Sequence, residues 1–419
     1  MKRILLLNCL FLLAGSIQSV RAQNNTSPYS IIGIGDIEKS SFDRSSGMGH
    51  AGLALSSKQF FYQANPAAFS SIDEHFFYFE TNARYKSVNY TGTPISDPTQ
   101  SNSTDLQIKK IGLAIKPLPK WALSFGLMPY STANYSFNAQ KNVQGSNIAA
   151  DAYYQGSGST NQAFLTNSFN ISKNFSVGLQ ASYLFGQLKE TETLSDGVTD
   201  SVLNTTRNIY LGAPYFKLGA QYKAKINKNW GLGLGATITN KVDFTADYNL
   251  LVQNGNSILI NKEYQRANYF SVPVTYAGGF ALNYKNAYTF AADYTYQGWG
   301  SLNYKGINYS LVNSQRISAG VEYSKKVSYL DQQYERYFLQ AGFYYNDSYL
   351  RIAGNQLTDY GATIGAGIQL TSTLGLQGAI EIGKTGTTDN GLIKENYSQF
   401  NLTISYRDFW IPRKMKKYN

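Results

Sequence analysis

The stretch "GMGHAG", residues 47–52, has the residue types and spacing of GxGxxG, the glycine pattern of dinucleotide-binding turns. That pattern holds a pyrophosphate only where it follows a buried strand and opens a helix, because the helix then directs backbone N–H groups at the phosphates. Here the polar stretch "KSSFDRSS" precedes the motif, and Pro66 stops any helix that begins after it. We therefore expect no nucleotide site. We interpret the three glycines as positions where the backbone turns tightly and comes close to other parts of the chain.

Other residue types that support catalysis are also poorly placed. His50 and His75 are the only histidines, and the single cysteine, Cys9, lies in the leader described below, so no metal cluster is readable. No serine stands in a GxSxG elbow with a histidine to serve it. We predict that the protein is not an enzyme and has no metal or cofactor. A lipid hydrolase is the alternative, and it lacks a catalytic constellation.

Residues 1–22, "MKRILLLNCLFLLAGSIQSVRA", predict where the chain goes. Lys2 and Arg3 begin the stretch, an apolar run follows over 4–14, and small residues end it, as in a secretory signal peptide. The apolar run is too short to cross about 30 Å of hydrocarbon, and Cys9 comes too early for a lipoprotein attachment site. We expect this segment to be removed.

The charge of the mature chain constrains its partners. Loss of the leader lowers the net charge from +11 to +8, because Lys2, Arg3 and Arg21 leave with it. A basic balance suits an anionic surface such as lipopolysaccharide, or serves solubility alone. No basic run with interleaved aromatic residues indicates a nucleic-acid partner.

Strict alternation of apolar and polar residues dominates the mature chain and predicts strands with one apolar face. In "YFKLGAQYKAKI", residues 215–226, the residues from Phe216 to Ile226 at every second position are apolar, and Lys217 and its counterparts form the other face. The pattern recurs in three further stretches: 175–186, 360–370 and 398–406. Such stretches reach the roughly 9–11 residues with which a tilted strand crosses a membrane.

Aromatic residues and connection lengths support the same architecture. Tyr294, Tyr296 and Trp299, and Phe409 with Trp410, lie near segment ends, as in the aromatic girdles of membrane barrels. Short connections are expected at 117–119, 172–174, 227–229, 283–286 and 371–373, with a longer one at 325–335. Long connections are expected at 91–105, 138–160, 189–208, 251–257, 305–312, 347–357 and 386–395. Short periplasmic turns and long outer loops are typical of outer-membrane barrels.

These patterns predict an all-β fold: a monomeric, transmembrane antiparallel barrel of about fourteen strands over residues 75–410. Both termini would be periplasmic, with 411–419 as a C-terminal tail. Polar residues on inward faces are expected to hydrate or brace the interior: Asp293, Glu322, Glu381, Lys217, Gln221, Lys223 and Arg407.

Residues 23–74 do not alternate and contain glycine clusters and the turn "NPAAFS". About fifty residues are too few for an independent core, so we predict a hatch, or plug, inside the barrel, against whose wall Gly47, Gly49 and Gly52 fold. The aromatic patches "QFFYQ" (59–63) and "FFYF" (76–79) either form the apolar floor of a binding pocket beside the hatch or pack the hatch against the wall.

Several stretches resemble one family. "SPYSIIGIGD" (27–36), "GMGHAGLAL" (47–55) and "NPAAFSSID" (65–73) are similar to the N-terminal region of Bacteroidetes outer-membrane proteins of the OMPP1/FadL/TodX type, as are "LSFGLMPYSTANYSF" (123–137) and "SYRDFWIPRKMKK" (405–417). The resemblance covers the mature chain and implies a fourteen-stranded barrel with an N-terminal hatch. The NPA motif of the family matches Asn65, Pro66 and Ala67, which with Phe60 and Phe61 are our candidates for the hatch and substrate site.

The family also implies a kink in the third strand that opens the wall sideways to lipid. Pro129 ends the third expected strand, and Pro273 raises the same question in the eighth. Proline cannot donate a ladder hydrogen bond, so each residue marks either an opening or merely a bulge or rim. We expect Pro129 to be a lateral-gate residue.

The resemblance implies passive transport of hydrophobic small molecules, either long-chain fatty acids or hydrocarbons, across the outer membrane among its lipids and lipopolysaccharide. Two rival hypotheses are a FadL-like barrel that serves a secretion system as a protein partner or scaffold, and a purely structural surface protein. An apolar cavity between hatch and wall would favour transport, and co-purification with secretion components would favour the protein partner.

Overall fold

The computed structural model describes residues 27–92, 101–142, 149–195, 202–306, 308–329 and 332–409. The predicted signal peptide, the C-terminal tail and Trp410 lie outside these residues.

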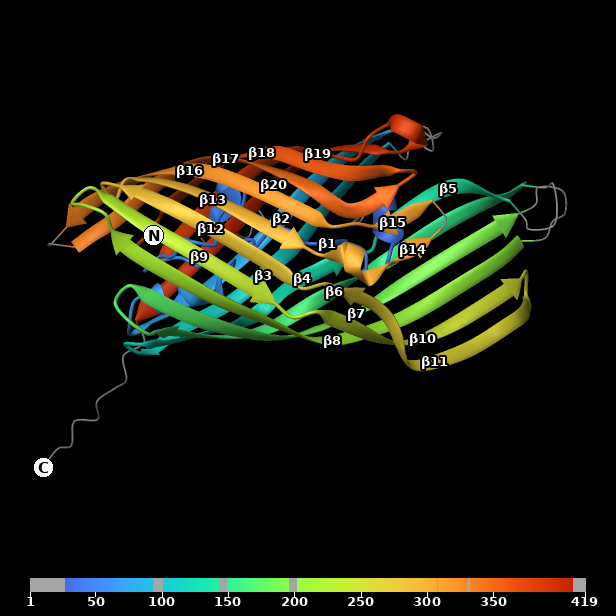
Figure 1. Cartoon of the computed structure of the whole chain (residues 1–419), viewed down its shortest axis with the longest axis horizontal. Helices are drawn as coiled ribbons and strands as arrows, with labels where there is room; N and C mark the ends of the chain where they lie inside the picture. Colours follow the sequence, from blue (N-terminus) through green and yellow to red (C-terminus); the bar gives the residue numbers. More distant parts are fainter. Residues whose placement is uncertain are drawn as a thin grey trace, which may run out of the picture.

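Fourteen antiparallel strands close into a barrel, as predicted (Figure 1). The ring closes where the first strand pairs with the last along their full lengths, from Phe76 opposite Phe409 to Thr91 opposite Lys394. The strands are β2 (Phe76–Thr91), β3 (Asn102–Leu118), β4 (Trp121–Thr132), β5 (Tyr135–Asn142), β6 (Ala149–Asn170), β7 (Phe175–Ser195), β8 (Val202–Lys225), β9 (Trp230–Thr239), β10 (Val242–Asn254), β11 (Ser257–Val272), β12 (Thr275–Tyr284), β13 (Tyr288–Gln297), β16 (Ser314–Tyr329), β17 (Gln332–Ile352), β18 (Asn355–Gln369), β19 (Leu374–Thr385) and β20 (Lys394–Phe409).

Three of the fourteen are interrupted strands, built from β4 and β5, from β9 and β10, and from β11 and β12. Pro273 causes the third interruption, because it cannot continue the ladder. The remaining elements are short: the strands β1 (Asp36–Ile37), β14 (Lys305–Gly306) and β15 (Tyr309–Leu311), and the 3-10 helices η1 (Pro28–Ile31), η2 (Arg44–Met48), η3 (Pro66–Ser71), η5 (Trp299–Leu302) and η6 (Asp389–Gly391).

The alternation predicts which side chains face outward. In β8, Phe216, Leu218 and Tyr222 are exposed on the outer surface, whereas Gly219 and Gln221 are buried inside. Side chains alternate between outward and inward in the same way in β7 and β18, where Leu179 and Ile364 are exposed on the outer surface. The barrel therefore presents large apolar side chains outward around its wall, as a lipid-facing surface requires.

Several connections differ in length from the prediction. The expected short turns after β3, β6, β8, β12 and β18 are present, and we call this end of the barrel the short-turn end. The expected connections at 325–335, 251–257, 347–357, 138–160 and 189–208 are instead mostly strand: β16 reaches Tyr329, β10 reaches Asn254, β17 reaches Ile352, β6 begins at Ala149 and β8 begins at Val202. These predictions were wrong because the extensions do not alternate strictly: 250–252 and 258–260 are runs of consecutive apolar residues, so a period of two does not reveal the strands. At 353–354 a two-residue turn with positive φ at Ala353 and Gly354 replaces a long loop.

Away from the short-turn end the wall divides into two sheets. One contains β5, β6, β7, β8, β10 and β11, and the other contains β15, β17, β18, β19, β20, β2 and β3. On one side the gap lies between β3 and β5. On the other side Trp299 of η5 fills the gap between β11 and β17, stacking on Tyr349 at 4.3 Å and lying 5.9 Å from Phe270.

Residues 27–75, which we call the N-terminal segment, lie within the ring of strands (Figure 1). Its helix η2 packs on β16 to β19, and η3 packs on β4 and β6 to β8. Gly47 and Gly49 touch the wall so closely that a Cβ on either would overlap β17 or β18, and Gly49 has a φ of 66°. Gly47 and Gly49 thus serve close packing against the wall, as the sequence predicts, whereas a Cβ on Gly52 would meet Ser45 of the same segment at 3.0 Å.

Candidate functional site

The wall is incomplete beside Pro129. Strands β3 and β4 pair only from Leu118 opposite Trp121 to Ile111 opposite Leu127. Beyond Leu127, β4 stays paired with β6 through a register shift that begins at Pro129, and it leaves β3. Among the described residues, the part of β3 from Asn102 to Lys110 pairs with β2 alone. Pro129 therefore lies at a bulge that coincides with a lateral gap.

The N-terminal segment crosses this gap. Its strand β1 pairs with the end of β4, and the backbone N–H of Glu38 donates to the carbonyl of Tyr130 at 2.9 Å. The Glu38 carboxylate accepts from Lys109 of β3 at 2.6 Å and from Arg84 of β2 at 3.3 Å. Burial alone would raise the pKa of Glu38, but the charges of Lys109 and Arg84 outweigh it and bring that pKa to about 2. Glu38 thus latches the two sides of the gap together.

A β-bulge in β3 makes this latch possible. The register of β2 and β3 shifts between Asn82 and Ala83, so the consecutive residues Lys109 and Lys110 both point inward and are about 1% exposed. Lys109 reaches Glu38, and Lys110 pairs with Glu80. Alternation places only one of two neighbours inside, so sequence patterns could not reveal this pair.

An apolar cluster fills the interior behind the gap. Tyr130 and Ile37, which border the gap, pack against it. Its members come from the N-terminal segment and from inward faces of both sheets: Ile34, Ala133, Leu184, Leu188, Ile209, Leu211, Ala213, Val242, Phe244, Ala246, Phe270, Val272, Trp299, Leu311, Leu350, Leu357 and Leu392. Most interiors of water-filled barrels are polar, so this cluster marks a region suited to apolar compounds.

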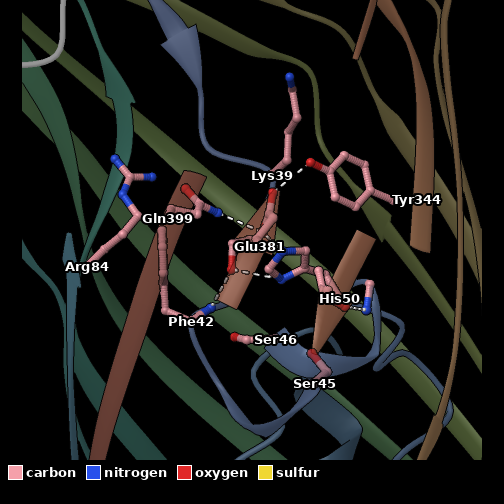
Figure 2. Close-up of polar contacts among 12 residues, drawn as sticks. Lys39, Phe42, Ser45, Ser46, His50, Arg84, Tyr344, Glu381 and Gln399 are labelled. Carbon is pink, nitrogen blue, oxygen red and sulfur yellow. Dashed lines mark hydrogen bonds and ion pairs between the residues drawn. The ribbon is translucent and has the colours of Figure 1, made fainter. Parts of the chain in front are cut away.

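A second interior region is charged. His50, whose φ is 68°, places Nε2 at 2.9 Å from Glu381 and Nδ1 at 3.1 Å from Ser40. Glu381 also accepts from Tyr344 at 2.7 Å and from Gln399 at 2.6 Å (Figure 2). These bonds hold the N-terminal segment to β17, β19 and β20, so Glu381 braces the interior as the sequence predicts.

Arg44 makes the most extensive of these attachments. Its guanidinium donates to Glu322 at 2.8 and 2.9 Å and to Glu335 at 2.6 and 2.8 Å. The guanidinium carbon also lies over the rings of Phe60 and Phe338, 4.4 and 3.9 Å from their centroids. Forked, bidentate pairing of this kind fixes orientation as well as charge.

The NPA motif contacts the wall. Asn65 caps η3 by accepting from the N–H of Ala67 at 3.0 Å, and its Nδ2 donates to the carbonyl of Ala220 in β8 at 3.0 Å. Pro66 opens η3 and lies against Gly178 and Gly219, where no side chain intervenes. The structure thus assigns these three residues an anchoring contact, and their role in binding a substrate stays a prediction.

Phe60 and Phe61 occupy different surroundings. Phe60 lines a cavity of about 1060 Å³ between the N-terminal segment and the wall toward the short-turn end, together with charged residues including Lys223 and Arg407. Phe61 is buried against Phe69 at 5.4 Å and Tyr78 at 6.4 Å. Phe61 therefore packs the segment against the wall, and the role of Phe60 in binding a substrate stays a prediction.

The part of the chain that the structure describes contains no group of three or more His, Cys, Asp or Glu residues that could hold a metal ion. Within the same residues, no helix has the length and apolarity needed to cross a membrane.

A protein-family model described as BamG matches residues 1–419. The chain belongs to the BamG family. Solved structures share the fold of this BamG-family chain at low identity. The Pseudomonas putida toluene transporter TodX is 16% identical, with a TM-score of 0.58 over 90% of this chain and 99% of that one. A Pseudomonas aeruginosa FadL homologue is 15% identical, with a TM-score of 0.59 over 88% and 98%.

The Ralstonia pickettii toluene transporter TbuX is 12% identical to the BamG-family chain, with a TM-score of 0.52 over 88% and 97%. No curated protein sequence matches the chain. The FadL/TodX-type barrel expected from the sequence is therefore confirmed as a fold. Membership of a Bacteroidetes branch stays a prediction.

Proposed function

We propose that this BamG-family protein is an outer-membrane barrel that admits hydrophobic small molecules, long-chain fatty acids or hydrocarbons, through the gap beside Pro129. The observation that carries the proposal is that this gap borders the interior apolar cluster through Tyr130 and Ile37. A compound dissolved in the lipid would pass from one apolar environment to another without crossing water. The outward apolar side chains support a location in the membrane.

In this proposal residues 23–74 form the hatch. Passage requires the Glu38 latch and the β1–β4 pairing to part, after which the cavity of about 1060 Å³ receives the compound toward the short-turn end. Three of the structures that share the fold are described as toluene transporters or a FadL homologue, which agrees with such a role. Phe60, Asn65, Pro66 and Ala67 would then act in the hatch and Pro129 in the gate.

The proposed sidedness follows the connections. Short turns would face the periplasm, which places the end of β20 at Phe409 there. The first described residue, Ser27, bonds Asn134 at 2.8 Å and Glu395, the second residue of β20, at 2.5 Å, so it lies toward the opposite end.

The test is uptake of labelled toluene and a labelled long-chain fatty acid in cells that lack the chromosomal gene. The wild-type gene should restore uptake, and Pro129→Val, which supplies a ladder N–H, should slow it. Pro119→Val, in the short turn after β3, is the matched control and should behave as wild type. Equal uptake with and without the gene for both compounds would refute the proposal.

A second candidate function is that of a protein partner or scaffold in a secretion machine. The observation that favours it is the free edge of β11, which among the described residues pairs with β10 alone and exposes Ile258, Leu259 and Ile260. Unpaired edges accept strands from other chains. Co-purification of stoichiometric secretion components, together with unchanged uptake, would support this function over transport.

A further inference from the structure

The outer, lipid-facing surface of the barrel carries a groove of about 650 Å³ that neither proposed function uses. Its floor is a row of small outward residues that lie opposite one another across four strands: Val177 in β7, Ala220 in β8, Ala236 in β9 and Gly278 in β12. Phe169 of β6 and Tyr294 of β13 close the two ends of this row.

Rows of large side chains flank the small ones on both sides, and one of these rows, Leu179 to Tyr276, lines the groove. Away from the short-turn end, the next row of outward side chains is Leu179, Leu218, Ile238 and Tyr276. Toward the short-turn end the next outward row is Phe175, Tyr222, Leu234 and Phe280. All eight side chains are exposed. A row of small residues between two rows of large ones makes a furrow across the strands.

The furrow is about as long as one lipid chain. From Val177 to Tyr294 it crosses four inter-strand steps of roughly 4.8 Å each, about 19 Å in all, which compares with about 15 Å for one leaflet. It begins two residues from the start of β7 and ends six residues from the start of β13. It therefore rises from the short-turn end toward the middle of the wall.

Two lysines lie at the end of the furrow that is nearest the short-turn end of the barrel. Lys173 lies in the turn between β6 and β7, four residues before Val177. Lys120 lies in the neighbouring turn, where its carbonyl accepts from the N–H of Asn170, three residues before Lys173, at 2.9 Å. Both lysines are exposed, and neither forms an ion pair with a residue that the structure describes. A phosphate at the membrane surface would complement these two charges.

We propose that the furrow is a binding site for one phospholipid, whose acyl chain lies over Ala220, Ala236 and Gly278 and whose phosphate meets Lys120 and Lys173. The furrow faces hydrocarbon in the membrane, so a chain, rather than water, is the occupant that fills it. Packing along the whole chain distinguishes this lipid from its neighbours, since in a bilayer association depends on close packing and polar contacts. The site is independent of transport through the interior.

The test is native mass spectrometry of the full barrel, extracted in mild detergent, stripped of lipid and then offered phosphatidylglycerol or phosphatidylcholine. Wild type should retain one lipid, with phosphatidylglycerol favoured. Ala236→Phe fills the floor and should remove the bound-lipid mass. Gly278→Leu should do the same, and a Cβ there meets nothing closer than 3.9 Å. Ala366→Phe, at an exposed outward position of β18, should bind as wild type.

Lys120→Gln with Lys173→Gln should abolish the preference for phosphatidylglycerol and leave binding of the acyl chain. Folding of each variant is checked by the shift of its gel mobility on heating. Retention of lipid by folded Ala236→Phe and Gly278→Leu at the level of Ala366→Phe would overturn the site. An unchanged lipid preference in the double lysine variant would overturn the assignment of the phosphate. Retention of detergent alone by wild type would overturn both.

Discussion

At the scale of residues, the interior of this barrel is organised by charges that meet from distant parts of the chain. Arg44 pairs with two carboxylates, Glu38 with two cations, and His50 with Glu381. All of these groups are buried or nearly so, and a buried charge is tolerated only when it is paired. Each attachment therefore fixes the position of the N-terminal segment.

Removal of Arg44 should be costly. Arg44→Met leaves Glu322 and Glu335 buried without a cation, and we expect the free energy of unfolding to fall by about 3–5 kcal/mol. Urea unfolding in detergent micelles measures this change. Arg207→Met is the matched control, because Arg207 is half exposed and lies 3.4 Å from Glu190. That control should change the unfolding midpoint little, and equal effects of the two variants would contradict the buried attachment.

The Glu38 latch should weaken in acid. The pKa of Glu38 falls from an ordinary 4.5 to about 2 in the folded chain, so its contribution to stability is complete above pH 4.5 and is lost as the pH falls toward 2. Glu38→Gln lacks this titration. The difference in unfolding free energy between wild type and Glu38→Gln should therefore shrink between pH 4.5 and 2, as measured by denaturant unfolding at each pH. A difference that does not change over this range would show that Glu38 is not held as an anion.

At the scale of elements, the helix η3 fits against the wall because the wall carries glycines, without side chains, at the contact. Pro66 and Asn65 approach the backbone of β7 and β8 at Gly178 and Gly219. Any side chain on those inward positions would occupy the space of the NPA turn. The position of the turn therefore depends on glycine at both of these positions in the barrel.

Gly219→Ala tests this fit. A Cβ at position 219 would overlap Asn65 Oδ1 and Pro66, and we expect a loss of about 1–3 kcal/mol from overpacking. Gly231→Ala, in β9, is the control, because the nearest atoms to its Cβ are 3.8 Å away. The temperature of the heat-induced gel shift and the rate of proteolysis of the N-terminal segment report the outcome. Similar behaviour of the two variants would contradict the anchoring role.

Sequence periodicity predicted the elements that face lipid and missed those that depend on distant partners. Alternation in 215–226 identified both faces of β8 because one face is uniformly apolar. It could not place Lys109 and Lys110, since a bulge breaks the period, nor the pairing of Asp36 and Ile37 with β4, since two residues carry no pattern. Periodicity also could not identify the role of Arg44, because the carboxylates with which Arg44 pairs lie almost three hundred residues away in the sequence.

At the scale of the whole molecule, the barrel is a closed ring toward the short-turn end and two facing sheets beyond it. The ring gives a complete ladder where lipid leaves no other partner for the backbone. The divided part gives two gaps, one closed by Trp299 and one crossed by β1 and Glu38. The central claim is that the second gap opens to admit hydrophobic compounds.

A removable crosslink between β1 and β4 tests that claim most directly. Ile37 lies opposite Ser131, and the one cysteine of the sequence, Cys9, lies in the predicted signal peptide, so Ile37→Cys with Ser131→Cys supplies a pair at a separation that suits a disulfide. Ala114→Cys with Ser124→Cys, across the paired part of β3 and β4, is the control. We predict that oxidation of the first pair stops uptake of labelled toluene and fatty acid, that reduction restores it, and that the control pair transports in both states. Equal uptake by the oxidised and reduced forms of the first pair would contradict the account.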